Sequence, residues 1–497
     1  MKKCFSVVSL TAMVLLAGCS GSQQLAAPVK APIDRLRDSI AARFNDPAFS
    51  NAHWGVVIQS LKNGEVIYAR NENKCFMPAS NMKLFTTSAG LTALTPSFRY
   101  TTSLDANGSI VNGVLQGDLI LRGSGDPTIS GRYNGGKVTE TFEQWADSLK
   151  VLGITEINGN LIGDDNCFDE EFYGDGWEAG YETDYYAAQF GGIVFNDNCV
   201  DVTVTAGDSI GKKPIITCVP NTGYVTFINE TVTTAADSNS YISFLRERGT
   251  NRIHVRGNFP INKQAWKESI AIDNPTRFAV TVLKEVLEQK GIRITGTAFD
   301  IDELPQAPDT AKLHIATYVS PALDQILKTI NKPSQNLYAE QLFRTTGLQK
   351  FGIGSARAAL NAENLIFASW GMDTTKMEVI DGSGLSRLDL ISPSNVIALL
   401  KGMHDGPFFT PFYESLPIAG VDGSIRNRMK GTKAENNVHA KTGFIGYVRA
   451  LSGYVTSADG EMFMFSMIAN NYTVSTLRAE RIQNDVCVML AGFSRFQ

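Results

Sequence analysis

Three short motifs lie far apart in this chain of 497 residues, and their order constrains the fold more than any other feature. They are Ser-x-x-Lys at residues 80–83, Ser-x-Asn at residues 334–336 and Lys-Thr-Gly at residues 441–443. The first two are 254 positions apart (334 minus 80), whereas the second and third are 107 apart (441 minus 334). One compact site does not need so long a first connection, which indicates a separate domain inserted after the first motif.

The first motif has the composition of an activated nucleophile. A serine hydroxyl attacks well only when a neighbouring base takes its proton. Positions i and i+3 share one face of a helix, so the Lys83 amine can reach the Ser80 oxygen. The run from Lys83 to Leu94 is rich in apolar residues and lacks proline, which predicts a helix. Ser80 then lies at a helix N-terminus, where unpaired N–H groups can help to hold an oxyanion.

The other two motifs supply groups for proton relay and substrate binding. Ser334 offers a second hydroxyl as a relay, and Asn336 offers an amide that can bind the substrate backbone. Lys441 and Thr442 supply a positive charge and a hydroxyl suited to a substrate carboxylate. Gly443 lets the substrate lie close to that strand. The lysine of the first motif has to exchange a proton, so we expect a lowered pKa there, whereas Lys441 has only to remain charged.

A second Ser-x-x-Lys match occurs at residues 209–212. It lies among two glycines and an aspartate, which are typical of a turn rather than of a helix start. We therefore expect Ser80, and not Ser209, to be the nucleophile.

In this order, the motifs resemble those of the penicillin-interacting serine enzymes, which include penicillin-binding proteins and serine β-lactamases. The long insert, with the flanking residues 334–340, 381–387 and 416–424, resembles class C penicillin-binding proteins of the penicillin-binding protein 4 type, peptidase family S13. The resemblance implies a penicillin-sensitive D-alanyl-D-alanine carboxypeptidase or endopeptidase without a cofactor. Peptidoglycan stem peptides would be its substrates, Ser80 would carry the acyl group, and β-lactams would be covalent inhibitors.

Phe444 departs from the family pattern, because members often carry a small hydroxylic residue directly after Lys-Thr-Gly. Its backbone N–H can still contribute to an oxyanion hole. The terminal carboxylate of the substrate loses a hydroxyl partner, however. The departure therefore concerns substrate preference rather than the class of reaction.

Two other functions use the same motifs. A β-lactamase or esterase would need a dedicated deacylation water and would not need an insert of this size. A non-catalytic module that binds the cell wall would have no use for an activated Ser/Lys pair. Both alternatives account for fewer of the sequence features than the peptidase does.

The pattern along the chain predicts a catalytic domain built from both ends of the sequence. Residues 31–98 and 264–497 are assigned to it, and residues 99–263, with short strands and Gly/Asp turns, to a β-rich insert. We expect helices at 33–44, 275–290 and 475–490, and strands at 54–58, 66–70, 437–441, 447–456 and 461–469. Strands from both ends must then form one sheet with helices on its faces. The resemblance implies a multi-domain α/β fold whose core has the antiparallel sheet of the serine β-lactamases and transpeptidases.

The N-terminus predicts export. Lys2 and Lys3 precede an apolar run at residues 5–16, which is too short for a permanent membrane helix and is typical of a signal peptide. Residues 1–18 are therefore expected to be removed, and the expected location is the periplasm.

The end of this leader resembles a bacterial lipobox, with Leu-Ala-Gly-Cys at residues 16–19. Cys19 is expected to become the lipidated first residue that holds the protein to a membrane, with residues 19–30 as a polar tether. Ser20 favours the outer over the inner membrane by the habit of such lipoproteins. An ordinary secretory signal with a chance cysteine is the alternative.

Charge and cysteine content exclude other classes of function. With 45 basic and 50 acidic residues and no basic cluster, the chain has no electrostatic basis for a nucleic-acid partner. No C-x-x-C occurs and the five histidines are scattered, so no metal site is expected. Among the cysteines of the insert, Cys167, Cys199 and Cys218, one disulfide is possible.

Overall fold

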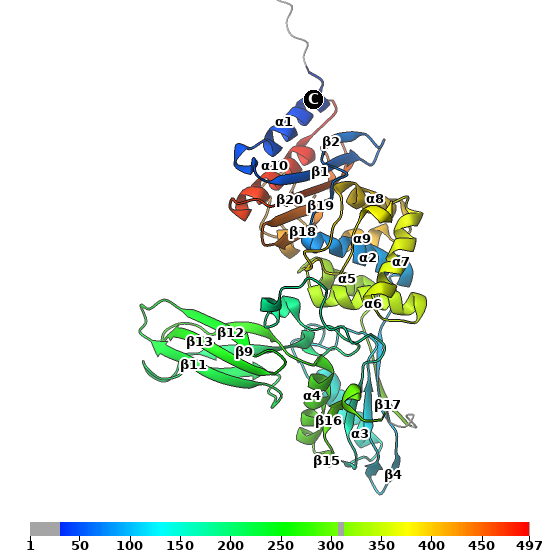
Figure 1. Ribbon diagram of the computed structural model, residues 1–497, viewed down its shortest axis with the longest axis vertical. Coiled ribbons are helices and arrows are strands. Elements are labelled where there is room, and N and C mark those ends of the chain that lie inside the picture. Colours follow the sequence, from blue (N-terminus) through cyan, green and yellow to red (C-terminus); the bar gives the residue numbers. More distant parts are fainter. Residues whose placement is uncertain (1–29, 307–312, 497) are drawn as a thin grey trace, which may run out of the picture.

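The computed structural model describes residues 30–306 and 313–496, and the expected signal peptide and Cys19 lie outside these residues. Figure 1 shows a domain of helices and strands formed by both ends of the chain, a second domain below it, and a β-rich arm that extends sideways. None of the described helices is both long and apolar enough to cross a membrane.

The upper domain carries the three motifs, and we call it the catalytic domain. It is built around one sheet. Its strands are β1 His53–Ser60, β2 Val66–Arg70, β18 His439–Ile445, β19 Val448–Thr456 and β20 Met462–Asn470. They pair antiparallel throughout, in the order β18-β19-β20-β1-β2, so β18 lies at an edge. The expected antiparallel sheet, formed by strands from both ends of the chain, is confirmed.

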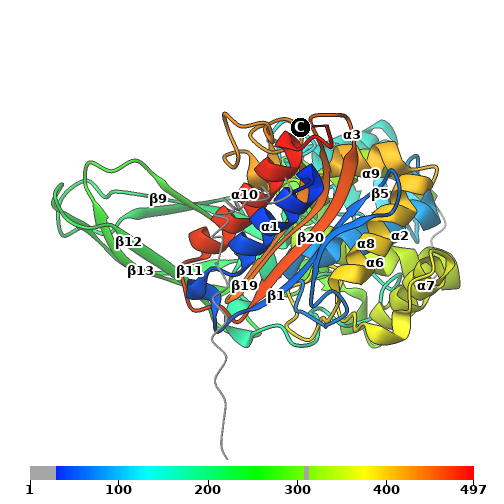
Figure 2. The ribbon, with the colours of Figure 1, turned by 90° about the horizontal axis from the view of Figure 1, so that it is seen from above.

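Helices cover both faces of this sheet. They are α1 Pro32–Phe44, α2 Met82–Leu94, α5 Leu323–Asn331, α6 Asn336–Phe351, α7 Ala356–Ser369, α8 Pro393–Asp405, α9 Phe409–Ser415 and α10 Thr476–Gly492. Helices α1 and α10 lie on one face, and α2 and α8 lie on the other (Figure 2). The two apolar faces of the sheet therefore contribute to two separate hydrophobic cores.

Helix α2, which follows the first motif, is buried on nearly all sides. Ten of its residues, from Met82 to Leu91, are buried, because α5, α6, α7 and α8 all contact it. At Gly90 a Cβ atom would lie 2.8 Å from the Leu342 side chain, so glycine is what lets α6 approach so closely. Dense packing of this kind fixes the first turn of α2, which carries Lys83.

The inserted domain contains two sheets and two helices. One sheet has the order β16-β8-β6-β3-β17 and the other β15-β7-β5-β4, and α3 and α4 share their apolar core. The elements are β3 Thr101–Ala106, β4 Ser109–Val111, β5 Val114–Gln116, β6 Leu119–Arg122, α3 Glu140–Val151, β7 Glu156–Ile157, β8 Leu161–Asp164, α4 Pro275–Gln289, β15 Arg293–Ile294, β16 Ala298–Asp300 and β17 Leu313–Val319.

The second boundary of the insert differs from the expected position at residue 263. Strand β17 pairs with β3, and β16 pairs with β8, so residues beyond 263 complete an inserted sheet. The chain returns to the catalytic domain only between Val319 and Leu323, where β17 ends and α5 begins. The assignment of residues 264–320 to the catalytic domain was wrong, because helical periodicity does not show which sheet a helix covers.

The arm is formed by two three-stranded sheets, β10-β9-β14 and β11-β13-β12. Its strands are β9 Cys199–Thr205, β10 Ile215–Val219, β11 Thr226–Thr234, β12 Tyr241–Arg246, β13 Arg252–Pro260 and β14 Trp266–Ala271. Apolar residues of these strands belong to the same hydrophobic core as the inserted domain. The base of the arm therefore packs directly against that domain.

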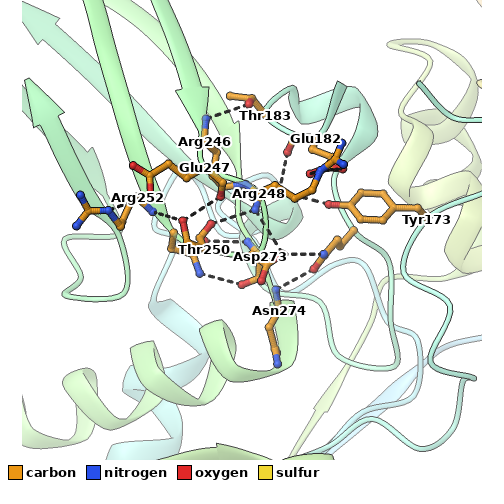
Figure 3. Close-up of polar contacts among 12 residues, drawn as sticks. Tyr173, Glu182, Thr183, Arg246, Glu247, Arg248, Thr250, Arg252, Asp273 and Asn274 are labelled. Atoms are coloured by element: carbon orange, nitrogen blue, oxygen red, sulfur yellow. Dashed lines mark hydrogen bonds and ion pairs between the residues drawn. The ribbon is translucent and has the colours of Figure 1, made fainter. Parts of the chain in front are cut away.

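A buried arginine connects the root of the arm to the rest of the insert (Figure 3). The Arg246 side chain is 1% exposed and lies 3.4 Å from the Asp273 carboxylate. Its guanidinium also donates to the Glu182 carbonyl at 2.8 Å, to the Tyr173 hydroxyl at 3.3 Å and to the Thr250 carbonyl at 3.1 Å. Because Tyr173 and Glu182 belong to the segment that continues to the active site, the arm and that segment are held together.

The five cysteines among the described residues are all free. Cys199 is buried, and Cys167 and Cys218 are partly exposed. The disulfide that the sequence leaves open in the insert is therefore not formed in this structure.

Candidate active site

The structure brings the three motifs into one cleft of about 530 Å³. Ser80 lies in the short helical turn Ala79–Asn81, directly before α2, and its hydroxyl opens onto the cleft. The Lys83 Nζ atom lies 3.1 Å from Ser80 Oγ. Ser334, Asn336 and Thr442 also line the cleft. The distance between Lys83 and Ser80 suits a nucleophile and its base.

Lys83 is fully buried and its amine donates to oxygen acceptors only. Besides Ser80 Oγ, it donates to Asn336 Oδ1 at 2.6 Å and to the Ser383 carbonyl at 2.7 Å. Burial lowers the pKa of Lys83 to about 7, because it disfavours the charged form. The expected lowering of this pKa is thus confirmed, and burial is its largest cause. The charged groups that act on this pKa are the carboxylates of Asp381, Glu340 and Asp389, and they raise it.

A loop after α7 holds the Ser383 carbonyl against Lys83. The Asp381 carboxylate accepts the backbone N–H groups of three loop residues, namely Ser383, Gly384 and Ser386. Glu340, one helical turn after Asn336, accepts the N–H of Ser383 at 2.9 Å. The pKa of Glu340 is raised to about 7 by burial and by Asp381. These two carboxylates therefore position the loop rather than contact a substrate.

Lys441 does not have the environment that the sequence suggests. It is 0% exposed and donates to Ser334 Oγ at 2.7 Å and to the Thr442 carbonyl at 3.0 Å. No described carboxylate forms an ion pair with it. Burial, Lys83 and Arg449 lower the pKa of Lys441 well below its ordinary value. Burial therefore works against the charged form of Lys441, and its charge beside a substrate carboxylate stays a prediction.

Ser334 is held in a strained backbone conformation between the two lysine motifs. Its φ is +67°, which a residue with a Cβ atom rarely adopts. This conformation directs Oγ to Lys441 Nζ while the next residues start α6. Such strain at a functional residue is consistent with a hydroxyl that has to occupy one position.

Gly443 has a packing role that the sequence does not predict. A Cβ atom at this position would lie 2.5 Å from the Pro78 carbonyl, in the turn that carries Ser80. Gly443 therefore allows that turn to pack against β18, whereas Phe444 is 55% exposed and lines the cleft. Thr442 also lines the cleft, and its hydroxyl donates to Ser424 Oγ at 2.7 Å.

Asn81 connects the first and third motifs and was missed in the sequence. Its amide donates to the Lys441 carbonyl at 2.9 Å and accepts from Ser452 Oγ at 2.6 Å. Its place inside Ser-x-x-Lys, next to the nucleophile, is the only signal that marks it.

The inserted domain forms one wall of the cleft. Tyr181, Tyr185 and Tyr186 line it, and the Tyr186 carbonyl accepts from the Asn336 amide at 2.7 Å. Asn336 therefore binds Lys83 with its oxygen and the insert with its nitrogen. No sequence signal marks these tyrosines, because they lie about 150 residues before α6 in the chain.

Two groups outside the cleft do not contribute to it. His439 packs its ring on Tyr413 with centroids 3.9 Å apart, as a strand residue would. The described residues contain one set of potential metal ligands, the neighbouring carboxylates of Asp165, Asp300 and Asp302 in the insert. Burial and Asp300 raise the pKa of Asp165 to about 7.

The D-Ala-D-Ala carboxypeptidase 3 (S13) family matches residues 36–492, a range that includes all three motifs. The chain belongs to this family. A D-alanyl-D-alanine carboxypeptidase from Actinomadura sp. (strain R39) is 32% identical over 501 residues, covering 99% of this chain and 90% of the relative. D-alanyl-D-alanine carboxypeptidase DacB from Haemophilus influenzae is 28% identical over 458 residues, covering 89% and 93% of the two chains.

Two solved structures have a similar fold over most of their length. The crystal structure of penicillin binding protein 4 (dacB) from Haemophilus influenzae matches with a TM-score of 0.79 and 26% identity, covering 92% of this chain and 99% of that one. The same protein complexed with a novel β-lactam matches with a TM-score of 0.72 and 25% identity, covering 90% and 97%. The chain is therefore a penicillin-sensitive serine D-Ala-D-Ala carboxypeptidase of the S13 family, with a core of one antiparallel sheet between helices and an additional β-rich domain.

Proposed function

We propose that this protein removes the terminal D-Ala from peptidoglycan stem peptides through an acyl-enzyme formed on Ser80. The observation that carries this assignment is the Lys83 amine, fully buried, 3.1 Å from Ser80 Oγ and with a pKa of about 7. An amine with that pKa is largely able to accept a proton at neutral pH. An exposed lysine would be charged and could not act as a base.

The residues of the cleft divide the reaction between them. Lys83 takes the hydroxyl proton while Ser80 Oγ forms a bond to the carbonyl carbon of the penultimate D-Ala. The oxyanion is stabilised by backbone N–H groups at the start of α2 and by the backbone N–H of Phe444. When the C–N bond breaks, the leaving amine takes a proton from Ser334 Oγ, which Lys441 can reprotonate across its hydrogen bond. Water then attacks the ester carbonyl carbon and gives its proton through Ser334 Oγ to Lys441. As the ester bond breaks, the proton on Lys83 returns to Ser80 Oγ, so the hydroxyl and both lysines are restored.

Asn336 is proposed to bind the backbone of the stem peptide, with Thr442 beside the terminal carboxylate. The same chemistry applies when the leaving amine belongs to a cross-linked stem, so we also propose endopeptidase activity. β-Lactams present a strained amide to Ser80 and remain bound as the acyl-enzyme. The β-lactam complex of the Haemophilus influenzae protein supports this route of inhibition.

Mass spectrometry of products from defined peptidoglycan fragments tests the assignment. With an uncross-linked pentapeptide fragment, we expect one D-Ala to be lost and the remaining stem to be intact. With a cross-linked dimer, we expect two monomers from endopeptidase cleavage. If the purified protein releases no D-Ala and no monomer at any pH between about 6 and 9, the proposed function is wrong.

For location, we propose a periplasmic lipoprotein anchored through Cys19, more specifically in the outer membrane. The support is the lipobox at residues 16–19 and the polar tether that precedes α1. Replacing Cys19 by serine should move the protein from the membrane pellet to the soluble fraction, because no other anchor is expected. Fractionation with and without high salt measures this, and continued pelleting of the variant in high salt would contradict the lipoprotein assignment.

A further inference from the structure

The cleft around Ser80 carries one cationic side chain, and it is not a motif lysine. Among the described residues that line the cleft, Arg449 is the only cation, and none is acidic. Lys441, to which the sequence assigns the substrate carboxylate, is 0% exposed and does not line the cleft. A carboxylate that enters the cleft therefore meets Arg449 before it can meet Lys441.

Arg449 lies on the same edge of the site as the residues that the carboxylate should approach. It is the cross-strand partner of Phe444 in the pairing of β18 with β19. Because side chains alternate along a strand, Thr442 and Phe444 project to one face of the sheet, and Arg449 projects to that face with them. The Arg449 guanidinium carbon lies 5.5 Å from the centre of the Phe444 ring. The exposed ring and the guanidinium thus form the end of the cleft beyond Thr442.

The guanidinium is held in place but keeps free donor capacity. One of its terminal nitrogens lies 2.6 Å from the Glu480 carboxylate on α10, and the side chain is 12% exposed. The Arg449 Nε atom is buried and has no hydrogen-bond partner among the described residues. A guanidinium has five N–H donors, and a buried donor without a partner costs free energy. A second carboxylate could therefore bind without breaking the pair with Glu480.

We propose that Arg449 binds the C-terminal carboxylate of the peptide substrate and so replaces the hydroxyl partner that Phe444 removes. The proposal rests on the carboxypeptidase function above, because the substrate must carry a free carboxylate one residue beyond the bond that Ser80 attacks. Arg449 then determines the preference for substrates with a free C-terminus. Lys441 keeps its hydrogen bond to Ser334 Oγ and serves in proton transfer to the leaving amine rather than in binding the carboxylate.

The test compares one peptide in two forms. The purified full chain is given an N-acylated tripeptide ending in D-Ala-D-Ala, either with its free carboxylate or with a C-terminal amide, and kcat/KM is measured for both. Arg449→Gln should lower kcat/KM for the acid by about 10- to 100-fold, the effect of losing a charge-assisted hydrogen bond. The value for the amide should change by less than about threefold, so that the preference for the acid collapses. For Arg449→Lys, the ratio of kcat/KM for the acid to that for the amide should lie between the ratios of the wild type and of Arg449→Gln.

Arg428→Gln is the matched control. Arg428 is buried to a similar degree and donates to Asn484 and Gln483 on α10, as Arg449 does to Glu480, but it does not line the cleft. Its replacement should leave the ratio of acid to amide unchanged, and thermal unfolding of both variants shows whether the fold is retained. Equal loss on acid and amide for Arg449→Gln, or no loss, overturns the proposal. A wild-type protein that cleaves neither peptide would instead overturn the carboxypeptidase function on which it rests.

Discussion

Replacing Ser80 by alanine should abolish covalent labelling by penicillin and peptide hydrolysis, with the fold retained. The change removes the one oxygen that Lys83 can deprotonate for attack, since the Ser334 hydroxyl is already bound to Lys441. Loss of a catalytic nucleophile lowers turnover by a factor on the order of a million. Labelling with a tagged penicillin, followed by mass spectrometry of the peptides, measures the effect and locates the label.

Ser209→Ala is the control for this result. Ser209 heads the second Ser-x-x-Lys, but the structure places it in a turn between β9 and β10, where its carbonyl accepts from the Lys212 N–H at 3.1 Å. This variant should be labelled as fully as the wild type. A label found on Ser209, or retained in the Ser80 variant, would mean that the nucleophile has been assigned wrongly.

Replacing Lys83 by arginine should slow acylation by a factor on the order of a thousand or more, the scale of losing general-base help. Arginine keeps a positive charge but does not release its proton at any working pH. Lys441→Arg should retain measurable acylation, because the Lys441 amine is bonded to Ser334 Oγ rather than to the nucleophile. Rates with one β-lactam decide the matter. If Lys83→Arg were the milder change, Lys83 would not be the base.

Because arginine is larger than the buried lysine, Lys83→Met supplies an uncharged variant of similar length, and it should be equally slow. The pH profile of the wild type gives an independent measurement. The pKa of Lys83 is lowered to about 7, so the amine is protonated below that pH and neutral above it. Acylation should therefore increase as pH rises through about 7 and then level off. The carboxylates of Asp381, Glu340 and Asp389, which face Lys83, oppose this lowering. A rate that falls over this interval would contradict a lysine base.

The sequence predicts the reaction well because local geometry determines it. Ser80 and Lys83 are three residues apart on one helix, so their contact follows from helical periodicity alone. The antiparallel core also follows, since the resemblance extends over strands at both ends of the chain. What the sequence could not show depends on pairing at long range. The pairing of β17 with β3, which moves the insert boundary, joins segments about 200 residues apart and leaves no local pattern.

The roles of individual groups were harder to predict, because burial and not residue type decides them. A lysine in Lys-Thr-Gly suggests a permanent charge, yet Lys441 is completely buried and its pKa is lowered. Gly443 suggests access for a substrate, yet the Pro78 carbonyl occupies the space beside it. Arg449 was missed because the expected strands, residues 437–441 and 447–456, leave residue 444 in the connection between them, whereas β18 continues to Ile445 and pairs residue 444 with residue 449.

The tyrosines of the insert place part of the cleft outside the domain that performs the chemistry. Asn336 accepts a hydrogen bond from Lys83 and donates one to the Tyr186 carbonyl. A shift of the inserted domain would therefore move a direct hydrogen-bond partner of the base. Arg246 in turn joins the segment before these tyrosines to the root of the arm. Substitutions in the insert can therefore alter which peptides or antibiotics fit while every motif stays unchanged. Resistance and substrate range could diversify in residues that a survey of the three motifs would pass over.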